Sequence, residues 1–243
     1  MIFNLKRSVF GGASWHFDGA EQPAWASQGS DWMMAIGVSG TLTLFAPILH
    51  GDLCLVAGGK PGHYGVSGSS PDGVGGAGRQ VLSLTDVSLP AGVYTVTVGV
   101  SDSDTTLIGP NGLTWTAVSG QGKAGGRPGG DGEYAWSDPD TLLNTGWRYG
   151  AGGGHGASHN AAEARVASGA GGSVGTASSD QYAGHGGGIG TNAETHQQGW
   201  PGVDGTGQGG GGGRHWYNNG YQGVAGGSGG SGIVLIRKHK EVA

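Results

Sequence analysis

Glycine recurs at every third position in several short runs of this chain, and that spacing limits what the chain can fold into. The longest run comprises Gly220, Gly223, Gly226, Gly229 and Gly232. A three-residue period matches the polyproline-II screw, which has three residues per turn and no internal hydrogen bonds. Glycine along one edge removes the Cβ, so neighbouring helices can approach and exchange backbone hydrogen bonds. The spacing therefore predicts polyglycine-II helices packed side by side.

The glycine-rich part of the chain lacks the side chains of an ordinary core. Residues 120–232 hold 38 of the 58 glycines and only seven Val, Ile, Leu, Met or Phe residues. Burial of so few aliphatic side chains cannot offset a backbone entropy cost of about 1–2 kcal/mol per residue. Two alternatives remain, a flexible linker and a bundle of closely packed backbones. The earlier run Gly59, Gly62, Gly65 and Gly68 lies where glycine is rarer, and it favours the bundle.

The first half of the chain is predicted to form β-strands. The clearest candidate, Val93–Val100, begins with β-branched residues at nearly every position and follows a Pro-Ala-Gly turn sequence. The other candidates are Trp32–Val38, Thr41–Ala46, Asp52–Ala57, Gln80–Leu84 and Leu113–Val118, with an N-terminal strand at Ile2–Phe10. The apolar run Ile233–Arg237 directly follows the glycine zone, and we expect it to pair into the same sheet. No segment has a sustained 3.6-residue apolar period, so no long helix is expected.

The predicted fold class is all-β, with a β-sandwich-like scaffold that carries a bundle of polyglycine-II helices with exposed loops. We assign residues 1–118 to the scaffold, with residues 232–238 as its returning strand. Residues 119–231 are assigned to the glycine-rich bundle. The bundle would then be an insertion whose two ends are held by the β scaffold.

Charge and composition argue against several classes of protein. Eight Trp, seven Tyr and a net charge of only −5 argue against a wholly disordered chain. A charged content of 12% argues against a nucleic-acid partner, because phosphate binding requires a basic face. The N-terminus lacks the apolar segment of a signal peptide, and no apolar stretch has the length of a membrane span. We therefore expect synthesis in the cytosol and no membrane insertion.

Polar segments rich in aromatic residues lie between the glycine runs. Rigid aromatic side chains give a large contact area at low entropic cost, as in recognition loops. The candidate receptor-binding residues are Tyr134, Trp136, Trp147, Tyr149, Tyr182, Trp200, Arg214, Trp216, Tyr217, Asn218 and Tyr221. Packing at the ends of the bundle is the alternative role for each ring. The cluster at 214–221 is the best candidate for a contact surface.

No catalytic, metal or cofactor site is expected. His155 and His159 have the spacing of metal ligands, but they follow glycines in a predicted loop with no obvious third ligand. A glycan hydrolase would require paired acids along a groove, for which the candidates are Asp138 with Asp140 or Glu133. The sequence favours a protein that is not an enzyme and that needs no cofactor.

Four segments together resemble a known group of proteins. They are Ser39-Gly40-Thr41-Leu42-Thr43-Leu44 after Trp32, then Leu55-Val56-Ala57-Gly58-Gly59, then Pro90-Ala91-Gly92-Val93-Tyr94-Thr95-Val96-Thr97-Val98-Gly99, and finally Gly229-Gly230-Ser231-Gly232-Ile233-Val234-Leu235-Ile236-Arg237. They are similar to the glycine-rich proteins encoded in tail modules of phages and prophages of Gram-positive gut bacteria. The likeness covers most of the chain from about Asp31 to Arg237. More distantly, the glycine patterning resembles the adhesin that caps the long tail fibre of T-even-type Salmonella phages, which stacks polyglycine-II helices and displays loops at its tip.

The resemblance implies a virion protein that is synthesised in the bacterial cytoplasm and located in a phage tail. The implied function is that of a tail-tip or fibre adhesin, which binds the host surface through aromatic loops between the glycine helices. A structural tail-fibre or baseplate component without receptor binding is the alternative. The implied partners are a bacterial cell-surface glycan or protein and other phage tail proteins. The oligomeric state is open, with a homo-trimer among the possibilities.

Overall fold

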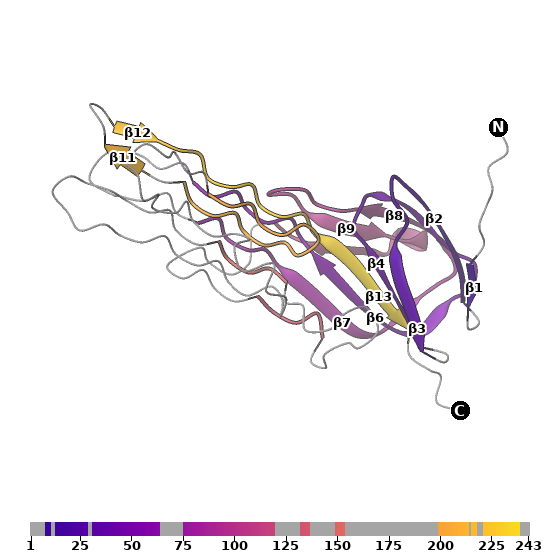
Figure 1. Cartoon of the computed structure of the whole chain (residues 1–243). Coiled ribbons are helices and arrows are strands. Elements are labelled where there is room, and N and C mark those ends of the chain that lie inside the picture. The colour runs from indigo at the N-terminus through magenta and orange to yellow at the C-terminus, as the bar shows by residue number, and fades with distance from the viewer. Residues whose placement is uncertain are drawn as a thin grey trace, which may run out of the picture.

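Two antiparallel β-sheets face each other at one end of the molecule, and glycine-rich segments extend away from them (Figure 1). The computed structural model describes residues 8–10, 13–28, 31–63, 75–119, 132–136, 149–153, 199–213, 215–217 and 221–238. These residues contain no α-helix and one short 3-10 turn, η1 (Pro110–Gly112). None of the described helices is long and apolar enough to cross a membrane.

The first sheet has six strands in the order β1-β2-β5-β8-β9-β10. They are β1 (Ser8–Phe10), β2 (Ala13–Gly19), β5 (Gly40–Leu44), β8 (Gly92–Thr97), β9 (Thr105–Ile108) and β10 (Thr114–Ala117). The second sheet has five strands in the order β3-β4-β13-β6-β7. They are β3 (Ala24–Gln28), β4 (Asp31–Ile36), β13 (Ile233–Lys238), β6 (Ile48–Val56) and β7 (Val81–Leu89). The predicted all-β, sandwich-like fold class is confirmed.

Alternation along the strands buries one face of each sheet between the two layers. On β5 and β8, Leu42, Leu44, Tyr94 and Val96 are buried, whereas the threonines between them are partly or fully exposed. The Tyr94 hydroxyl donates a hydrogen bond to the carbonyl oxygen of Pro90 at 2.7 Å. Burial raises the pKa of this phenol to about 12. The predicted turn before β8 is thereby tied to the core.

The closing strand β13 occupies the middle of the second sheet, between β4 and β6. The pairing predicted for this apolar run is therefore present. Val234 and Ile236 belong to the core between the sheets. Leu235 points to the opposite face, where it packs in a second cluster with Met33 and Cys54. A strand from the C-terminal part of the chain thus completes a sheet that N-terminal strands begin.

Three strands of the two large sheets, β2, β3 and β9, are not predicted by the sequence. In β2, the buried Trp15 and Phe17 alternate with the polar residues His16 and Asp18, but neighbouring glycines obscure this short pattern. Strand β3 lies at a sheet edge and consists mostly of small and polar residues, and β9 has four residues. Strand β1 covers the last three residues of the predicted Ile2–Phe10, and the rest lies outside the described residues.

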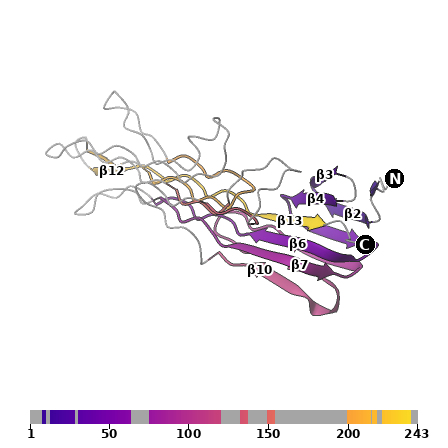
Figure 2. The same cartoon turned by 90° about the horizontal axis from the view of Figure 1, so that it is seen from below.

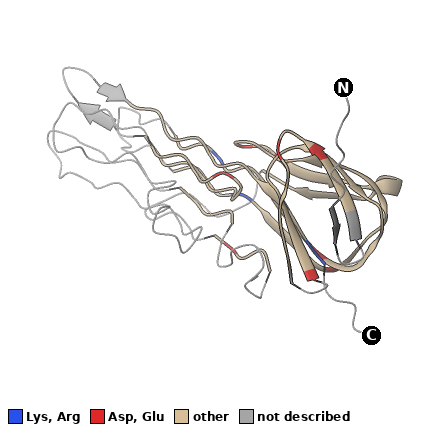
Figure 3. Ribbon diagram, turned by 45° about the vertical axis from the view of Figure 1, so that its right-hand side comes forward, with Lys and Arg blue, Asp and Glu red and all other residues tan. Residues whose placement is uncertain are grey.

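The glycine-rich segments form a bundle that is joined by hydrogen bonds between their backbones. We call it the glycine bundle, and its described segments are residues 57–63, 75–80, 149–153, 199–203, 207–213 and 224–232. Glycine N–H groups donate to carbonyl oxygens of neighbouring segments, as in Gly59 to Gly230 at 2.8 Å and Gly62 to Gly227 at 2.9 Å. Figure 2 shows these segments running together away from the sandwich. Charged residues are sparse along them (Figure 3).

The segment 207–213 is the centre of the glycine bundle. Its backbone exchanges hydrogen bonds with each of the other five segments, through the partners Lys60, Gly76, Ala151, Trp200 and Gly227 among others. Every residue from 206 to 213 is buried. An added Cβ at Gly209, Gly210 or Gly213 would overlap the carbonyl oxygen of a neighbouring segment, which explains why glycine is required at these positions.

Outer segments of the glycine bundle require glycine on only part of their circumference. Along 224–232, Ala225, Ser228 and Ser231 repeat every third residue and are partly or fully exposed, whereas the adjacent Gly227 and Gly230 are buried. This three-residue repeat supports the polyglycine-II screw, which stays a prediction. The division into a scaffold up to residue 118 and a bundle from residue 119 also stays a prediction. The glycine bundle additionally includes residues 57–63 and 75–80, which precede that boundary.

Candidate functional site

A two-stranded hairpin lies at the end of the glycine bundle that is farthest from the sandwich (Figure 1). We call it the tip hairpin; its strands are β11 (His215–Tyr217) and β12 (Tyr221–Gly223). In its antiparallel register, Trp216 lies opposite Gln222 and Tyr217 lies opposite Tyr221. The register therefore places Tyr217 and Tyr221 in one cross-strand pair and Trp216 in the next. The hairpin thus brings three predicted contact residues together at the tip.

The other predicted contact residues do not belong to β11 or β12. Trp147, Tyr182, Arg214 and Asn218 lie outside the described residues. Tyr134 and Trp200 are 46% and 51% exposed, so their side chains are accessible to solvent. Neither of these two residues belongs to the tip hairpin.

Trp136 is a packing residue. It is only 4% exposed and belongs to the second apolar cluster, on the outer face of the second sheet. The Arg237 guanidinium lies 4.4 Å from the centre of its ring, at a distance suited to a cation–π interaction. Arg237 also forms a buried ion pair with Asp52, in which its Nε donates to Oδ2 at 2.9 Å. These contacts hold the segment 132–136 against the sheet.

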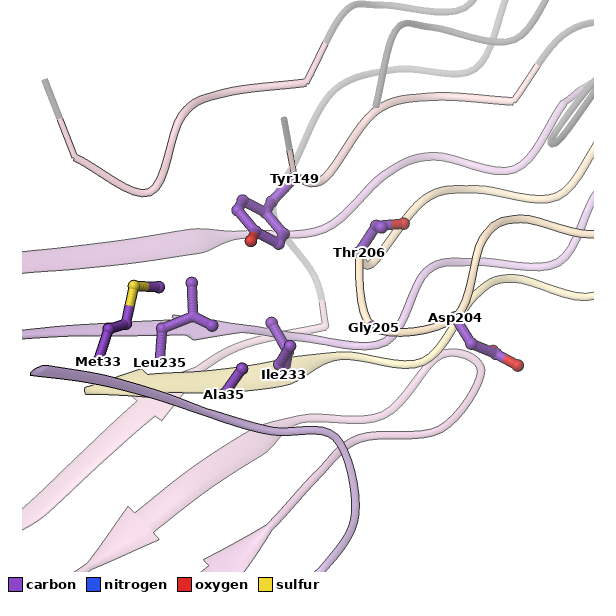
Figure 4. A pocket seen from close by; sticks show the side chains of 8 residues that line it. All are labelled: Met33, Ala35, Tyr149, Asp204, Gly205, Thr206, Ile233 and Leu235. Carbon is purple, nitrogen blue, oxygen red and sulfur yellow. The ribbon is translucent and has the colours of Figure 1, made fainter. Parts of the chain in front are cut away.

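Tyr149 lines a pocket between the second sheet and the glycine bundle, which we call the Tyr149 pocket. The pocket has a volume of about 200 Å³. It is lined by Met33, Ala35, Tyr149, Asp204, Gly205, Thr206, Ile233 and Leu235. Figure 4 shows the apolar side chains of β4 and β13 beneath the Tyr149 ring, with residues 204–206 beside them.

The walls of the Tyr149 pocket are fixed by backbone hydrogen bonds. Tyr149 and Glu133 exchange two of them, at 2.7 and 2.8 Å. The neighbouring Gly150 N–H donates to the Thr206 carbonyl oxygen at 2.7 Å. The turn around Thr206 uses Gly205 and Gly207 at positive φ, a conformation that glycine adopts readily. The sequence predicts Tyr149 as a contact residue but not the rest of this pocket, whose one local signal is the glycine-spaced turn Asp-Gly-Thr-Gly.

Four of the five predicted structural glycines that are described lie at contacts between backbones. An added Cβ would overlap a neighbouring carbonyl oxygen at Gly59, Gly62, Gly226 and Gly229. Gly223 instead belongs to β12, and Gly65, Gly68 and Gly220 lie outside the described residues. The four contacts indicate that glycine is required at these positions for backbone packing.

The described residues contain no cluster of three His, Cys, Asp or Glu side chains that could hold a metal ion. The candidates His155, His159, Asp138 and Asp140 lie outside them. Glu133 is described, and its backbone forms the bridge to Tyr149. Cys54 is fully buried, and that burial raises its thiol pKa to about 12, so the thiolate nucleophile is scarce near neutral pH.

One family model matches the chain. It is described as a glycine-rich domain and covers residues 35–239. The match includes β5 to β13 and the whole of the described glycine bundle. No curated protein matches the sequence.

Proposed function

The chain belongs to the glycine-rich domain family, and from that premise we propose that it is a phage tail-tip or fibre adhesin that binds the bacterial surface. The observation that carries the proposal is the position of the tip hairpin. It lies at the far end of the glycine bundle, whereas β1 and the C-terminal end of β13 lie at the sandwich end (Figure 1). In this proposal the sandwich attaches to other tail proteins and the glycine bundle presents the hairpin.

The composition of the tip suits a neutral surface glycan or a protein receptor. Trp216, Tyr217 and Tyr221 supply rings that can stack on sugars or on apolar side chains, and rings lose little entropy when they bind. The glycine bundle behind them contains few charges, so it adds little long-range attraction to either a basic or an acidic surface. The sequence resemblance to tail-module proteins supports the virion setting.

The proposal is tested by adsorption of the fluorescently labelled protein to a panel of Gram-positive gut bacteria. A Trp216→Ala/Tyr217→Ala variant removes two tip rings, and a Trp200→Ala/Tyr134→Ala variant removes two exposed rings elsewhere. We expect strain-selective binding that falls at least tenfold in the tip variant and is retained in the control variant. Absence of binding to every strain by the folded protein, or equal binding by both variants, would contradict it.

The alternative, a structural tail component, predicts a different phenotype. Deletion of a structural component prevents assembly of particles, whereas loss of an adhesin leaves intact particles that fail to adsorb. Electron microscopy of particles from a deletion strain, together with an adsorption assay, separates the two.

A further inference from the structure

We propose that the Tyr149 pocket binds one neutral pyranose ring, as a second glycan contact at the base of the glycine bundle. The choice of a sugar as the ligand rests on the proposed adhesin function. The location, size and polarity of the site come from the residues that line it. The site is separate from the tip hairpin, since no residue of β11 or β12 lines the pocket.

The pocket offers an apolar surface of the kind that holds the C–H face of a sugar. Ala35 on β4 and Ile233 and Leu235 on β13 form its floor, and the Tyr149 ring lies over them (Figure 4). Binding pockets for small molecules are lined mainly by apolar and aromatic side chains with a few polar groups that fix orientation. A volume of about 200 Å³ suits a single ring rather than a longer oligosaccharide.

The side chains of Asp204 and Thr206 lie at one side of the pocket (Figure 4), and the Asp204 carboxylate favours a hydrogen-bond donor without negative charge. Asp204 is exposed, and its Oδ1 accepts a hydrogen bond from the Ser231 N–H at 2.9 Å. Its carboxylate lies at the rim and is directed outward from the apolar floor (Figure 4). A carboxylate accepts strong hydrogen bonds from hydroxyl groups. The described lining residues include this one acid and no Lys, Arg or His, so among them an acidic sugar would meet repulsion without a compensating cation. Neutral hexoses and N-acetylhexosamines fit these constraints best.

The rim is rigid before any ligand arrives. Gly205 N–H donates to the Ser231 hydroxyl at 2.9 Å, and Gly207 N–H donates to the Ser231 carbonyl oxygen at 2.8 Å. The Thr206 hydroxyl donates to the Val203 carbonyl oxygen at 2.6 Å. A wall that is already ordered loses little conformational entropy on binding, which favours even a small ligand.

The experiment is saturation-transfer NMR on the full chain with glucose, galactose, N-acetylglucosamine and N-acetylgalactosamine, with glucuronic acid as the anionic comparator. Ala35→Leu fills the floor of the pocket. Ala24→Leu is its matched control, because Ala24 lies opposite Ala35 on β3, is exposed, and does not line the pocket. Asp204→Asn keeps an acceptor for the Ser231 N–H and removes the charge at an exposed position, so it tests the site even if Ala35→Leu fails to fold.

We expect at least one neutral sugar to bind, at least tenfold weaker binding in Ala35→Leu, several-fold weaker binding in Asp204→Asn and unchanged binding in Ala24→Leu. Binding of no neutral sugar, preference for glucuronic acid, or wild-type binding by both pocket variants would overturn the inference. The result of the sugar-binding experiment does not depend on whether the tip hairpin binds a receptor. Cells that adsorb the protein while no sugar binds would refute the pocket alone. Sugar binding without adsorption to any strain would refute the adhesin function alone.

Discussion

The sandwich and the glycine bundle solve the problem of burying a polypeptide backbone in opposite ways. In the sandwich, the sheets pair backbone groups within each layer, and side chains such as Leu42 and Ile236 fill the space between layers. In the glycine bundle, the segments pair backbone groups directly with their neighbours, and the absence of Cβ atoms permits that approach. Removal of a side chain should therefore destabilise the sandwich, whereas addition of one should destabilise the bundle.

The largest effect is expected from deletion of a core side chain in the sandwich. Leu42 is fully buried, and Leu42→Ala should lower the free energy of unfolding by about 3–5 kcal/mol, because it loses apolar burial and leaves a cavity. Val93 lies on the neighbouring strand β8 and is 59% exposed, so Val93→Ala should change stability by less than about 0.5 kcal/mol. Chemical denaturation of both variants measures the difference, and equal effects would contradict the assignment of the core.

Addition of a single methyl group to the bundle centre should have the next largest effect. A Cβ at Gly210 would overlap the carbonyl oxygens of Gly227 and Ser228, and neither can move without loss of bundle hydrogen bonds. We expect Gly210→Ala to cost about 3 kcal/mol in stability or in local opening of the glycine bundle.

Gly37 is the matched control for this substitution. A Cβ added at Gly37 would meet no neighbouring atom within 4 Å, and the residue lies in the sandwich, so Gly37→Ala should leave stability unchanged or raise it by up to about 1 kcal/mol. Thermal unfolding of the two variants compares them. If the Gly210→Ala protein were as stable as the Gly37→Ala protein, the proposed difference between the glycine bundle and the sandwich would be contradicted.

A smaller effect is expected when the pH is raised, and it should arise in the sandwich. Burial raises the pKa of Cys54 from 9.0 and that of Tyr94 from 10.0, in both cases to about 12. Between pH 9 and 12 the unfolded chain releases these protons while the folded chain keeps them, so the unfolding free energy falls as the pH rises. Urea denaturation at pH 7 and pH 10.5 should record this fall, and Cys54→Ala and Tyr94→Phe should each reduce it. An unchanged pH dependence in both variants would contradict the role of these groups.

The sequence predicts the parts of the fold in which a local pattern is strong. The β-branched run from Val93 and the apolar run Ile233–Arg237 are both observed as strands, because burial in a sheet depends on that pattern. The sequence does not predict that β13 lies between β4 and β6, since this order depends on contacts far apart in the chain. The unbroken glycines at 209–213 are a usable signal for the bundle centre, because a segment that contacts several backbones has little room for side chains.

The candidate site is predicted less completely than the fold. The cluster of aromatic residues near Trp216 is local in sequence, and the register of the tip hairpin places three of its members together. Trp136 also lies in a short aromatic segment of the sequence, close to Tyr134. Its ring is nevertheless buried against Arg237, because this segment packs onto the second sheet. The Tyr149 pocket combines residues from β4, β13 and two glycine-rich segments, so the local Asp-Gly-Thr-Gly turn could indicate only one of its walls.

The central claim is that the glycine bundle is as well ordered as the sandwich although it lacks a side-chain core. Hydrogen exchange of backbone amides tests this claim most directly, because it reports local opening at each segment. We predict that the amides of Gly209, Gly210 and Gly211, which donate across the bundle, are protected to the same order as those of β13. Exchange of these glycine amides at the rate of an unstructured chain, with β13 still protected, would contradict the account and would leave the tip hairpin on a flexible tether.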